Sequence, residues 1–144
     1  MPTAAEQAQA LFGPQYSCAQ AILMSFAPGL GLDQDQAARL ARGLGMGMAQ
    51  GLVCGAVSGA MLVLGLAQGP RQAEERAPRF ACYKALTDFC KRFEEVHGSI
   101  TCRDLLGVDL GTAQGRAEAQ ERGLFMSLCP RYVQSAAEIL QQML

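Results

Sequence analysis

One uncharged, glycine-rich segment constrains the fold of this chain more than any other part of it. Residues 43–66 read GLGMGMAQGLVCGAVSGAMLVLGL, and five of the glycines, Gly43, Gly47, Gly51, Gly55 and Gly59, stand four residues apart. Such a series stays near one face of a helix wherever the segment is helical. Each helical glycine costs about 1 kcal/mol relative to alanine. We therefore expect either close packing or a site centred on Cys54 to offset that cost.

The same uncharged run, residues 43–70, is long enough to raise the question of a membrane span with small-residue packing. Gln50 interrupts it, and its strongly apolar part, residues 52–67, is shorter than the roughly 20 residues that a span requires. We expect no membrane span. The segment instead predicts a buried central helix from about Leu52 to Leu66, preceded by a flexible glycine-rich turn.

Composition narrows the functional classes. A chain of 144 residues predicts a single domain, 1–144, that is large enough to bury a core. The net charge is −1 and there is no basic stripe, so we expect no nucleic-acid binding. The first residues, MPTAAEQAQALF, lack a basic start and a long apolar stretch, and we expect a cytoplasmic location. In that setting six cysteines favour a redox or metal site over a disulfide framework, although some could be core residues.

Hydrophobic periodicity predicts an all-α protein, a bundle of about six to eight helices around the central glycine-rich helix. No period-two pattern typical of strands persists anywhere. The expected helices cover residues 4–12, 18–27, 34–43, 52–66, 71–96, 99–107, 114–125 and 130–142. Pro78 either kinks the long fifth helix or marks where its main part begins.

The apolar positions predict which helix faces are buried. The third helix would bury Ala37, Leu40, Ala41 and Leu44. The long helix would bury Cys82, Leu86, Phe89, Phe93 and Val96, with Tyr83 and Cys90 beside this stripe, and would stop at His97-Gly98.

Four cysteines fall at or near predicted helix N-termini. Ser17 with Gln20 forms a capping-box pattern that makes Cys18 the first helical residue, and Thr101 with Asp104 does the same for Cys102. The other two are Cys129, just before Pro130 at a favoured N1 position, and Cys54, after the glycine-rich turn. The partial positive charge of a helix N-terminus stabilises a thiolate, which is both a nucleophile and a ligand for soft metals. The placement indicates a shared site.

The remaining candidate residues favour structural roles. Cys82 and Cys90 lie on one helix about 12 Å apart along its axis, too far for a disulfide, and we expect core packing. For His97, the only histidine, a contact with its helix C-terminus is favoured over catalysis. Arg103 and Asp104 are expected in a solvated first turn rather than tuning Cys102. Met46 and Met48 are expected to fill gaps around glycines rather than to bind copper.

The cysteine pattern, with its neighbours, resembles the C_GCAxxG_C_C family of redox-active proteins. The residues that carry the resemblance are SCAQA at 17–21, GMG at 45–47, CGAVSGA at 54–60, GSITCRDLLG at 98–107, and Cys129-Pro130. The match spans nearly the whole chain in order. It implies a helical, cysteine-based redox or metal protein whose signature cysteines are Cys18, Cys54, Cys102 and Cys129. Leu44 and Met46 stand where the family often has a purer glycine run.

Three functions are compatible with these residues. In the first, two of the four cysteines cycle between dithiol and disulfide, with Cys54 as the reactive thiol because its glycine neighbours leave room for a partner. In the second, Cys18, Cys54, Cys102 and Cys129 hold an iron–sulfur cluster or, less favoured because the ligands are dispersed, a zinc ion. In the third, the chain is a helical oligomerisation or interaction module with core cysteines.

Partners follow from these alternatives. Thiol chemistry implies a redox partner protein or a small thiol, and either a thiol-based oxidoreductase or an electron carrier would fit. The small apolar helices favour a homo-oligomer under all three functions.

Overall fold

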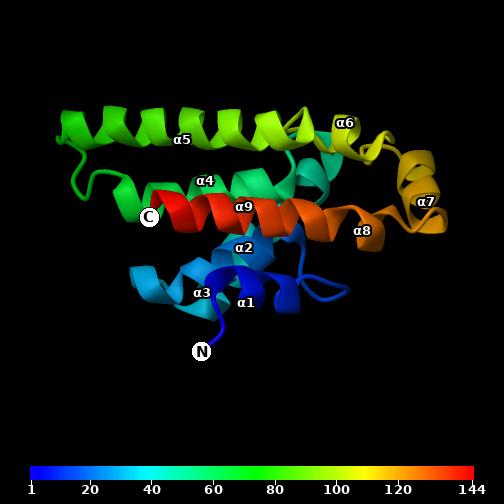
Figure 1. The fold of residues 1–144 in the computed structure, drawn as a ribbon, viewed down its shortest axis with the longest axis horizontal. Helices are drawn as coiled ribbons and strands as arrows, with labels where there is room; N and C mark the ends of the chain where they lie inside the picture. The colour runs from blue at the N-terminus through cyan, green and yellow to red at the C-terminus, as the bar shows by residue number, and fades with distance from the viewer.

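The computed structural model describes residues 1–144 and is built of helices joined by short turns (Figure 1). The helices are α1 (Ala4–Leu11), α2 (Cys18–Phe26), α3 (Gln34–Ala41), α4 (Gly55–Gln68), α5 (Arg76–His97), α6 (Cys102–Leu106), α7 (Ala113–Glu121), α8 (Leu124–Ser127) and α9 (Cys129–Met143). Shorter helical turns lie at Pro28–Leu30, Arg42–Leu44 and Gly47–Gly51. The only β-type pairings are isolated bridges. The all-α class is confirmed.

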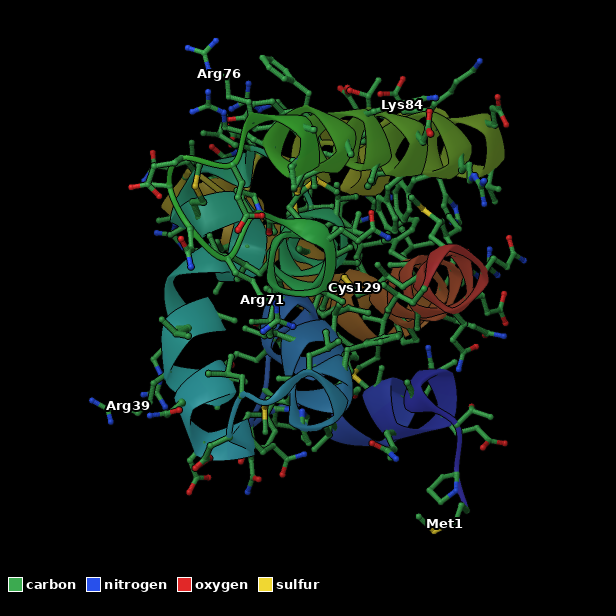
Figure 2. All side chains as sticks on the ribbon, turned by 90° about the vertical axis from the view of Figure 1, so that its left-hand side faces the viewer. Met1, Arg39, Arg71, Arg76, Lys84 and Cys129 are labelled. Carbon is green, nitrogen blue, oxygen red and sulfur yellow. The ribbon has the colours of Figure 1, made fainter.

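The glycine-rich helix α4 lies at the centre of the bundle, as predicted. It packs against α2, α5 and α9. In Figure 1, α5 runs along one side, α4 and α9 lie next to it, and α2 with α1 and α3 forms the opposite side. The short helices α6, α7 and α8 gather at one end. Figure 2 shows Arg39, Arg76 and Lys84 pointing outward, while Cys129 lies inside. No helix in the structure combines the length and the apolar character that a membrane crossing requires.

The predicted helix starts at Ser17 and Thr101 are confirmed. The hydroxyl of Ser17 accepts from the N–H of Gln20 at 3.3 Å, and the side-chain oxygen of Gln20 accepts from the N–H of Ser17 at 3.0 Å. Thr101 accepts from the N–H of Asp104 at 3.3 Å. The shorter Asp104 side chain does not close the box itself. Instead, the Ser99 hydroxyl donates to the Asp104 carboxylate at 3.0 Å and accepts from the N–H of Thr101 at 3.1 Å. Ser99 therefore bridges the Asp104 side chain and the backbone of the N-cap residue.

Close packing of α2 against α4 explains two of the spaced glycines. A Cβ on Gly59 would stand 2.9 Å from the carbonyl oxygen of Ala19 and 3.2 Å from the Cβ of Ile22. A Cβ on Gly55 would stand 3.0 Å from the backbone nitrogen of Ala19 and 3.2 Å from the Cβ of Cys18. Any larger residue at either position would push the two helices apart.

The other spaced glycines do not continue this helix face. The helix begins at Gly55 and not near Leu52, because Leu52 (φ −85°, ψ −132°) and Cys54 (φ −53°, ψ 134°) are not helical. The turn before them is left-handed. Four consecutive residues have positive φ: Met46 (53°), Gly47 (61°), Met48 (60°) and Ala49 (58°). Gly51 follows at 68°. Of the glycines that stand four residues apart, only Gly55 and Gly59 lie at the contact between α4 and α2. In the preceding turn the glycines at 47 and 51 adopt left-handed conformations at little steric cost.

Two predicted apolar faces need correction. Leu40 was expected to be buried, but it is 63% exposed, and α3 instead packs through Ala37, Ala38 and Ala41. Val96 was assigned to the buried stripe of α5, but it is 66% exposed near the end of that helix. In both cases the helix packs through a narrower stripe than the apolar residues suggest, because the neighbouring helices cover only part of the helix surface.

Helix boundaries also shift. Residues 71–75 are not helical, and α5 begins at Arg76 with Pro78 in its first turn, so the proline marks a helix start and not a kink. The predicted helix 114–125 divides into α7 and α8, because Gly123 adopts a left-handed conformation between them. The last helix includes Cys129 itself, with Pro130 as its second residue.

We predict that Gly59→Ala destabilises the protein by about 1–3 kcal/mol, because the new methyl group meets the backbone of α2. The matched control is Gly65→Ala on the same helix, where no atom lies within 4 Å of the new Cβ. That variant should gain up to about 1 kcal/mol from helix propensity. Chemical denaturation of both variants measures the difference, and equal effects at the two positions would contradict the packing argument.

The left-handed turn at residues 46–49 gives a second prediction. Replacing an alanine by glycine usually destabilises a protein, but here we expect it to stabilise the fold. Ala49→Gly should stabilise the protein by about 1 kcal/mol, because it removes a Cβ from a left-handed conformation. Ala67→Gly, the same change within α4, should instead destabilise by about 1 kcal/mol. Thermal and urea denaturation would show this reversal, and destabilisation of both variants would argue against the left-handed turn.

Candidate functional site

The four cysteines singled out from the sequence line one cavity. Cys18, Cys102 and Cys129 are the first residues of α2, α6 and α9, and Cys54 is the residue that caps α4. Each therefore sits at a helix N-terminus. The cavity has a volume of about 560 Å³ and is bordered by all four side chains. All six cysteines of the chain are free thiols in this structure.

A short backbone pairing aligns Cys54 with Cys102. The N–H of Cys54 donates to the carbonyl of Ile100, and the N–H of Cys102 donates to the carbonyl of Leu52, both at 2.7 Å. These bonds form an antiparallel bridge between the residues immediately before the two cysteines. The start of α4 is thereby held against the start of α6, although the two segments lie far apart in the sequence.

The helix packing described above brings Cys18 to the same place. Gly55, the first residue of α4, lies against the first turn of α2, and a Cβ there would stand 3.2 Å from the Cβ of Cys18. Gln20 fixes that turn from the other side, because its side-chain nitrogen donates to the carbonyl of Ala38 at 2.8 Å while its oxygen closes the Ser17 cap. The absence of a side chain at Gly55 is thus a condition for the approach of Cys18 to Cys54.

Helix α9 brings Cys129 and is anchored by two side-chain contacts. The hydroxyl of Tyr132 donates to the carbonyl of Leu105 in α6 at 2.9 Å. The side chain of Gln9 in α1 donates to the carbonyl of Pro130 at 2.7 Å. These contacts tie the N-terminal turn of α9 to α6 and to α1, and so position Cys129 at the cavity.

The first thiol pair is Cys54 with Cys102, and the two thiols differ in acidity. Hydrogen bonding with Cys102, burial and the negative charge of Cys102 raise the pKa of Cys54 well above its ordinary value. Hydrogen bonding from Cys54 lowers the pKa of Cys102, assisted by the backbone N–H of Gly55 and opposed by burial. The pKa of Cys102 therefore lies below that of Cys54, which makes Cys102 the more acidic thiol of the pair.

The second pair is Cys18 with Cys129. Hydrogen bonding with Cys129, then burial, and then the charges of the other three cysteines raise the pKa of Cys18 well above its ordinary value. A thiolate elsewhere in the cavity therefore makes ionisation of Cys18 unfavourable.

This acidity pattern bears on the choice of reactive thiol. We expected Cys54 to be the nucleophile because its glycine neighbours leave room. Cys54 does border the cavity, so a reaction partner has space to approach it. However, the pKa of Cys54 is raised and that of Cys102 is lowered, which favours Cys102 as the thiolate. The sequence could not show this difference, because it arises from contacts between segments that lie far apart in the chain.

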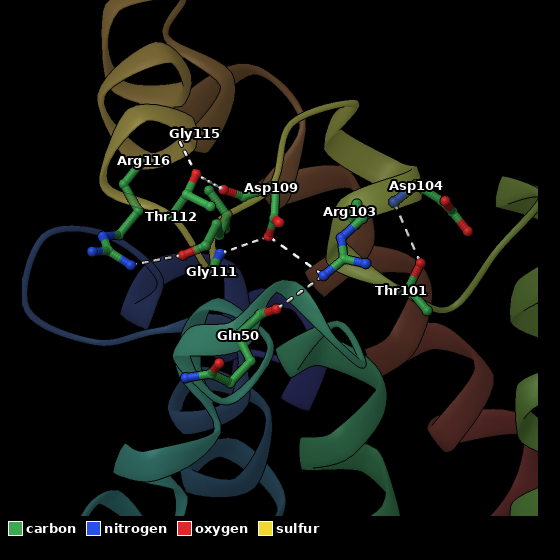
Figure 3. Close-up of polar contacts among 10 residues, drawn as sticks. Gln50, Thr101, Arg103, Asp104, Asp109, Gly111, Thr112, Gly115 and Arg116 are labelled. Carbon is green, nitrogen blue, oxygen red and sulfur yellow. Dashed lines mark hydrogen bonds and ion pairs between the residues drawn. The ribbon is translucent and has the colours of Figure 1, made fainter.

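Arg103 and Asp104 follow Cys102 and are both exposed. Figure 3 shows the Arg103 guanidinium between the carbonyl of Gln50, at 3.4 Å, and the carboxylate of Asp109, at 3.5 Å. Asp109 also accepts from the N–H of Gly111 at 2.8 Å. This exposed network ties α6 to the left-handed turn before α4. As expected, neither Arg103 nor Asp104 contributes to the lowered pKa of Cys102.

His97 does not line the cavity but packs behind it. Its Nε2 lies 2.8 Å from the hydroxyl of Ser135, and its ring centroid lies 5.0 Å from that of Tyr132, in an edge-on orientation. Burial lowers the pKa of His97. The histidine thus joins α5 to α9 and supports Tyr132. His97 is also the last residue of α5, the helix end at which the sequence placed it.

Several cavity residues carried no signal in the sequence. Aromatic side chains from three regions border the cavity: Phe12, Tyr16, Phe125 and Tyr132. Tyr132 follows Cys129 by three residues, a spacing that puts both on one face of a helix. This spacing is the only sign in the sequence that one of these aromatic residues would lie at the site. Met46 also borders the cavity but is 46% exposed, and Met48 is 44% exposed, so neither fills a buried gap as we had expected.

Cys82 and Cys90 lie outside this site. Cys82 is buried, and its sulfur lies 3.9 Å from the carbonyl oxygen of Leu64. Cys90 is partly buried on α5, where burial raises its pKa. Neither borders the four-thiol cavity.

The fit of a metal to this arrangement depends on the metal. No group of three or more His, Cys, Asp or Glu side chains is close enough to hold a single metal ion. The thiols are arranged as two pairs, which does not suit tetrahedral zinc. An iron–sulfur cluster is larger, and its four thiolate ligands surround it at greater separation. Four thiols at four helix N-termini around one cavity have the chemistry that such a cluster requires.

Comparison with known proteins identifies one family. The family model described as "Putative redox-active protein (C_GCAxxG_C_C)" matches residues 16–143, which include all four cavity cysteines. Searches of curated proteins and of solved structures gave no match.

We predict that Cys102 reacts with iodoacetamide at a lower pH than an ordinary cysteine, because its thiolate is stabilised by Cys54. Removing that donor in Cys54→Ala should slow alkylation of Cys102 at neutral pH by about tenfold or more. Cys54→Ser is the matched control, since its hydroxyl can still donate, and it should retain most of the rate. Mass spectrometry of peptides after timed alkylation measures each site. An unchanged rate in Cys54→Ala would contradict the assignment.

Proposed function

Because the chain belongs to the C_GCAxxG_C_C family of redox-active proteins, we propose that it performs two-electron dithiol–disulfide chemistry with Cys54 and Cys102 as the reacting pair. The observation that carries this proposal is the antiparallel bridge that holds Cys54 and Cys102 side by side at the cavity. The interaction of the two thiols raises the pKa of Cys54 and lowers the pKa of Cys102. Dithiol oxidoreductases require this asymmetry, because one sulfur must attack and the other must resolve the intermediate.

The proposed cycle balances atoms and electrons. The Cys102 thiolate attacks the oxidant and forms a covalent intermediate through its sulfur. Cys54 gives up its proton to the departing group, attacks the Cys102 sulfur and releases the reduced product. The net change is one Cys54–Cys102 disulfide formed, and one two-electron oxidant reduced. A reductant of the thiol class restores the dithiol.

The second pair gives the site further capacity. Cys18 and Cys129 border the same cavity and interact with each other and with the first pair. Exchange between the pairs would pass the disulfide from Cys54–Cys102 to Cys18–Cys129. Two dithiols can hold four electrons in total, which would suit an electron carrier as well as an enzyme.

We predict that limited oxidation of metal-free protein with diamide produces a Cys54–Cys102 disulfide before any other. Non-reducing peptide mapping identifies the disulfide. Cys102→Ser and Cys54→Ser should each abolish it. Cys90→Ser, which changes a thiol outside the cavity, should leave both its rate and its yield unchanged.

Two results would contradict the proposal. The first is oxidation that leaves all four cavity thiols intact, and the second is a first disulfide that involves Cys82 or Cys90. Either result would separate the reactive chemistry from the cavity. Circular dichroism of each variant shows whether the fold is retained, so that a loss of oxidation is not mistaken for unfolding.

A second candidate function is iron–sulfur cluster binding. It is favoured by the placement of all four thiols around one cavity at helix N-termini, whose N–H groups can donate to cluster sulfurs. Such a cluster would supply one-electron transfer. Anaerobic purification with iron and sulfide analysis tests it: matched iron and sulfide, lost in Cys129→Ser as in Cys54→Ser, would favour the cluster. Absence of both from anaerobic protein would leave the dithiol function.

A further inference from the structure

The four-thiol cavity has no cationic side chain on its walls. Twenty-one residues line it, and none of them is Asp, Glu, Lys, Arg or His. Thirteen of the 21 are hydrophobic. An anionic ligand in such a cavity would lose its hydration without gaining a cationic side chain, and it would be repelled by a Cys102 thiolate. We therefore expect the oxidant that reaches the thiols to be uncharged.

Aromatic and aliphatic side chains shape the cavity. Phe12, Tyr16, Phe125 and Tyr132 provide ring surfaces, and Leu105 adds an aliphatic wall beside Cys102. The volume of about 560 Å³ falls in the range typical of small-molecule sites, about 300–1,000 Å³. Ring surfaces bind flat, apolar molecules by stacking and by burial of apolar area.

We propose that the oxidant of the Cys54–Cys102 pair is a neutral, substituted quinone; this inference rests on the function proposed above. A quinone is flat and uncharged, and it accepts two electrons, the number that a dithiol releases. Gln15 and Gln120 line the cavity and are exposed, and a side-chain amide is a donor type that suits the carbonyl oxygens of a quinone. Glutathione disulfide carries several carboxylates, for which the cavity provides no cationic side chain.

The step balances with the quinone as the only co-reactant. The Cys102 thiolate adds to a ring carbon, forming a carbon–sulfur bond and an enolate oxygen. The proton of Cys54 passes to that oxygen. The Cys54 sulfur then attacks the Cys102 sulfur, the carbon–sulfur bond breaks, and the electron pair remains on the ring. A proton from solvent, equivalent to the one that Cys102 lost on ionisation, completes the hydroquinone.

The test uses reduced, metal-free, full-length protein under argon, with decylubiquinone as the probe. Every ring carbon of this quinone is substituted, which prevents stable arylation of the thiols. We expect one hydroquinone to form for each two thiols lost, with a rate that saturates as the quinone concentration rises. Glutathione disulfide at the same concentration should react at least about tenfold more slowly, because its charges are not matched.

A charged variant at the cavity wall isolates binding from thiol chemistry. Met126 borders the cavity and is 63% exposed, so Met126→Lys introduces a cation with little cost to folding. It should reduce the decylubiquinone rate at subsaturating concentration by about tenfold, equivalent to about 1.4 kcal/mol of lost binding. Ser127→Lys is the control, because it adds the same charge one residue away, outside the cavity lining.

Diamide distinguishes the two proposals. Oxidation by diamide with no reaction with decylubiquinone would overturn the quinone inference and retain the dithiol function. Failure of both oxidants would overturn both. Equal quinone rates in wild type, Met126→Lys and Ser127→Lys would place the reaction outside the cavity and would also overturn the inference. A decylubiquinone rate lowered in Met126→Lys and unchanged in Ser127→Lys would support it.

Discussion

The close approach of α2 and α4 is the contact on which the rest of this structure depends. Gly55 and Gly59 remove the side chains that would separate these helices, and the backbone of Ala19 occupies the space. The approach places the first turn of α2 directly against the first turn of α4, so Cys18 and Cys54 meet at one cavity. The helical glycines cost about 1 kcal/mol each relative to alanine, and the packing they permit offsets that cost.

Convergence of helix N-termini then determines the chemistry of the cavity. Four apolar-packed helices start at the cavity, each with a cysteine at its first turn or cap, and the unpaired N–H groups there provide positive potential. Burial opposes ionisation of Cys18, Cys54 and Cys102, so a thiolate at one of these positions needs hydrogen-bond donors. Cys102 meets that condition through Cys54 and the N–H of Gly55. The asymmetry within this pair is therefore a product of tertiary structure.

Local chemistry in the sequence predicted much of this fold. Ser17 with Gln20 fixes where α2 begins, and that cap is formed as the side chains imply. The glycine spacing was less informative, because the same fourfold interval continues through residues 43–51, where the backbone is left-handed and not part of α4. A spacing cannot distinguish a glycine needed for packing from one needed for its φ angle. The pairing of Cys54 with Cys102 was equally beyond prediction, since it depends on an antiparallel bridge between segments about fifty residues apart.

The most direct test of this account is the ionisation of each cysteine, followed by NMR of protein labelled with ¹³C at cysteine Cβ. The chemical shift of that carbon separates thiol, thiolate and disulfide. We predict that Cys102 titrates below the ordinary range for a thiol, while Cys18 and Cys54 remain protonated well above it. Four cavity cysteines titrating together in the ordinary range would show that the thiols do not interact as pairs. That result would contradict the central claim.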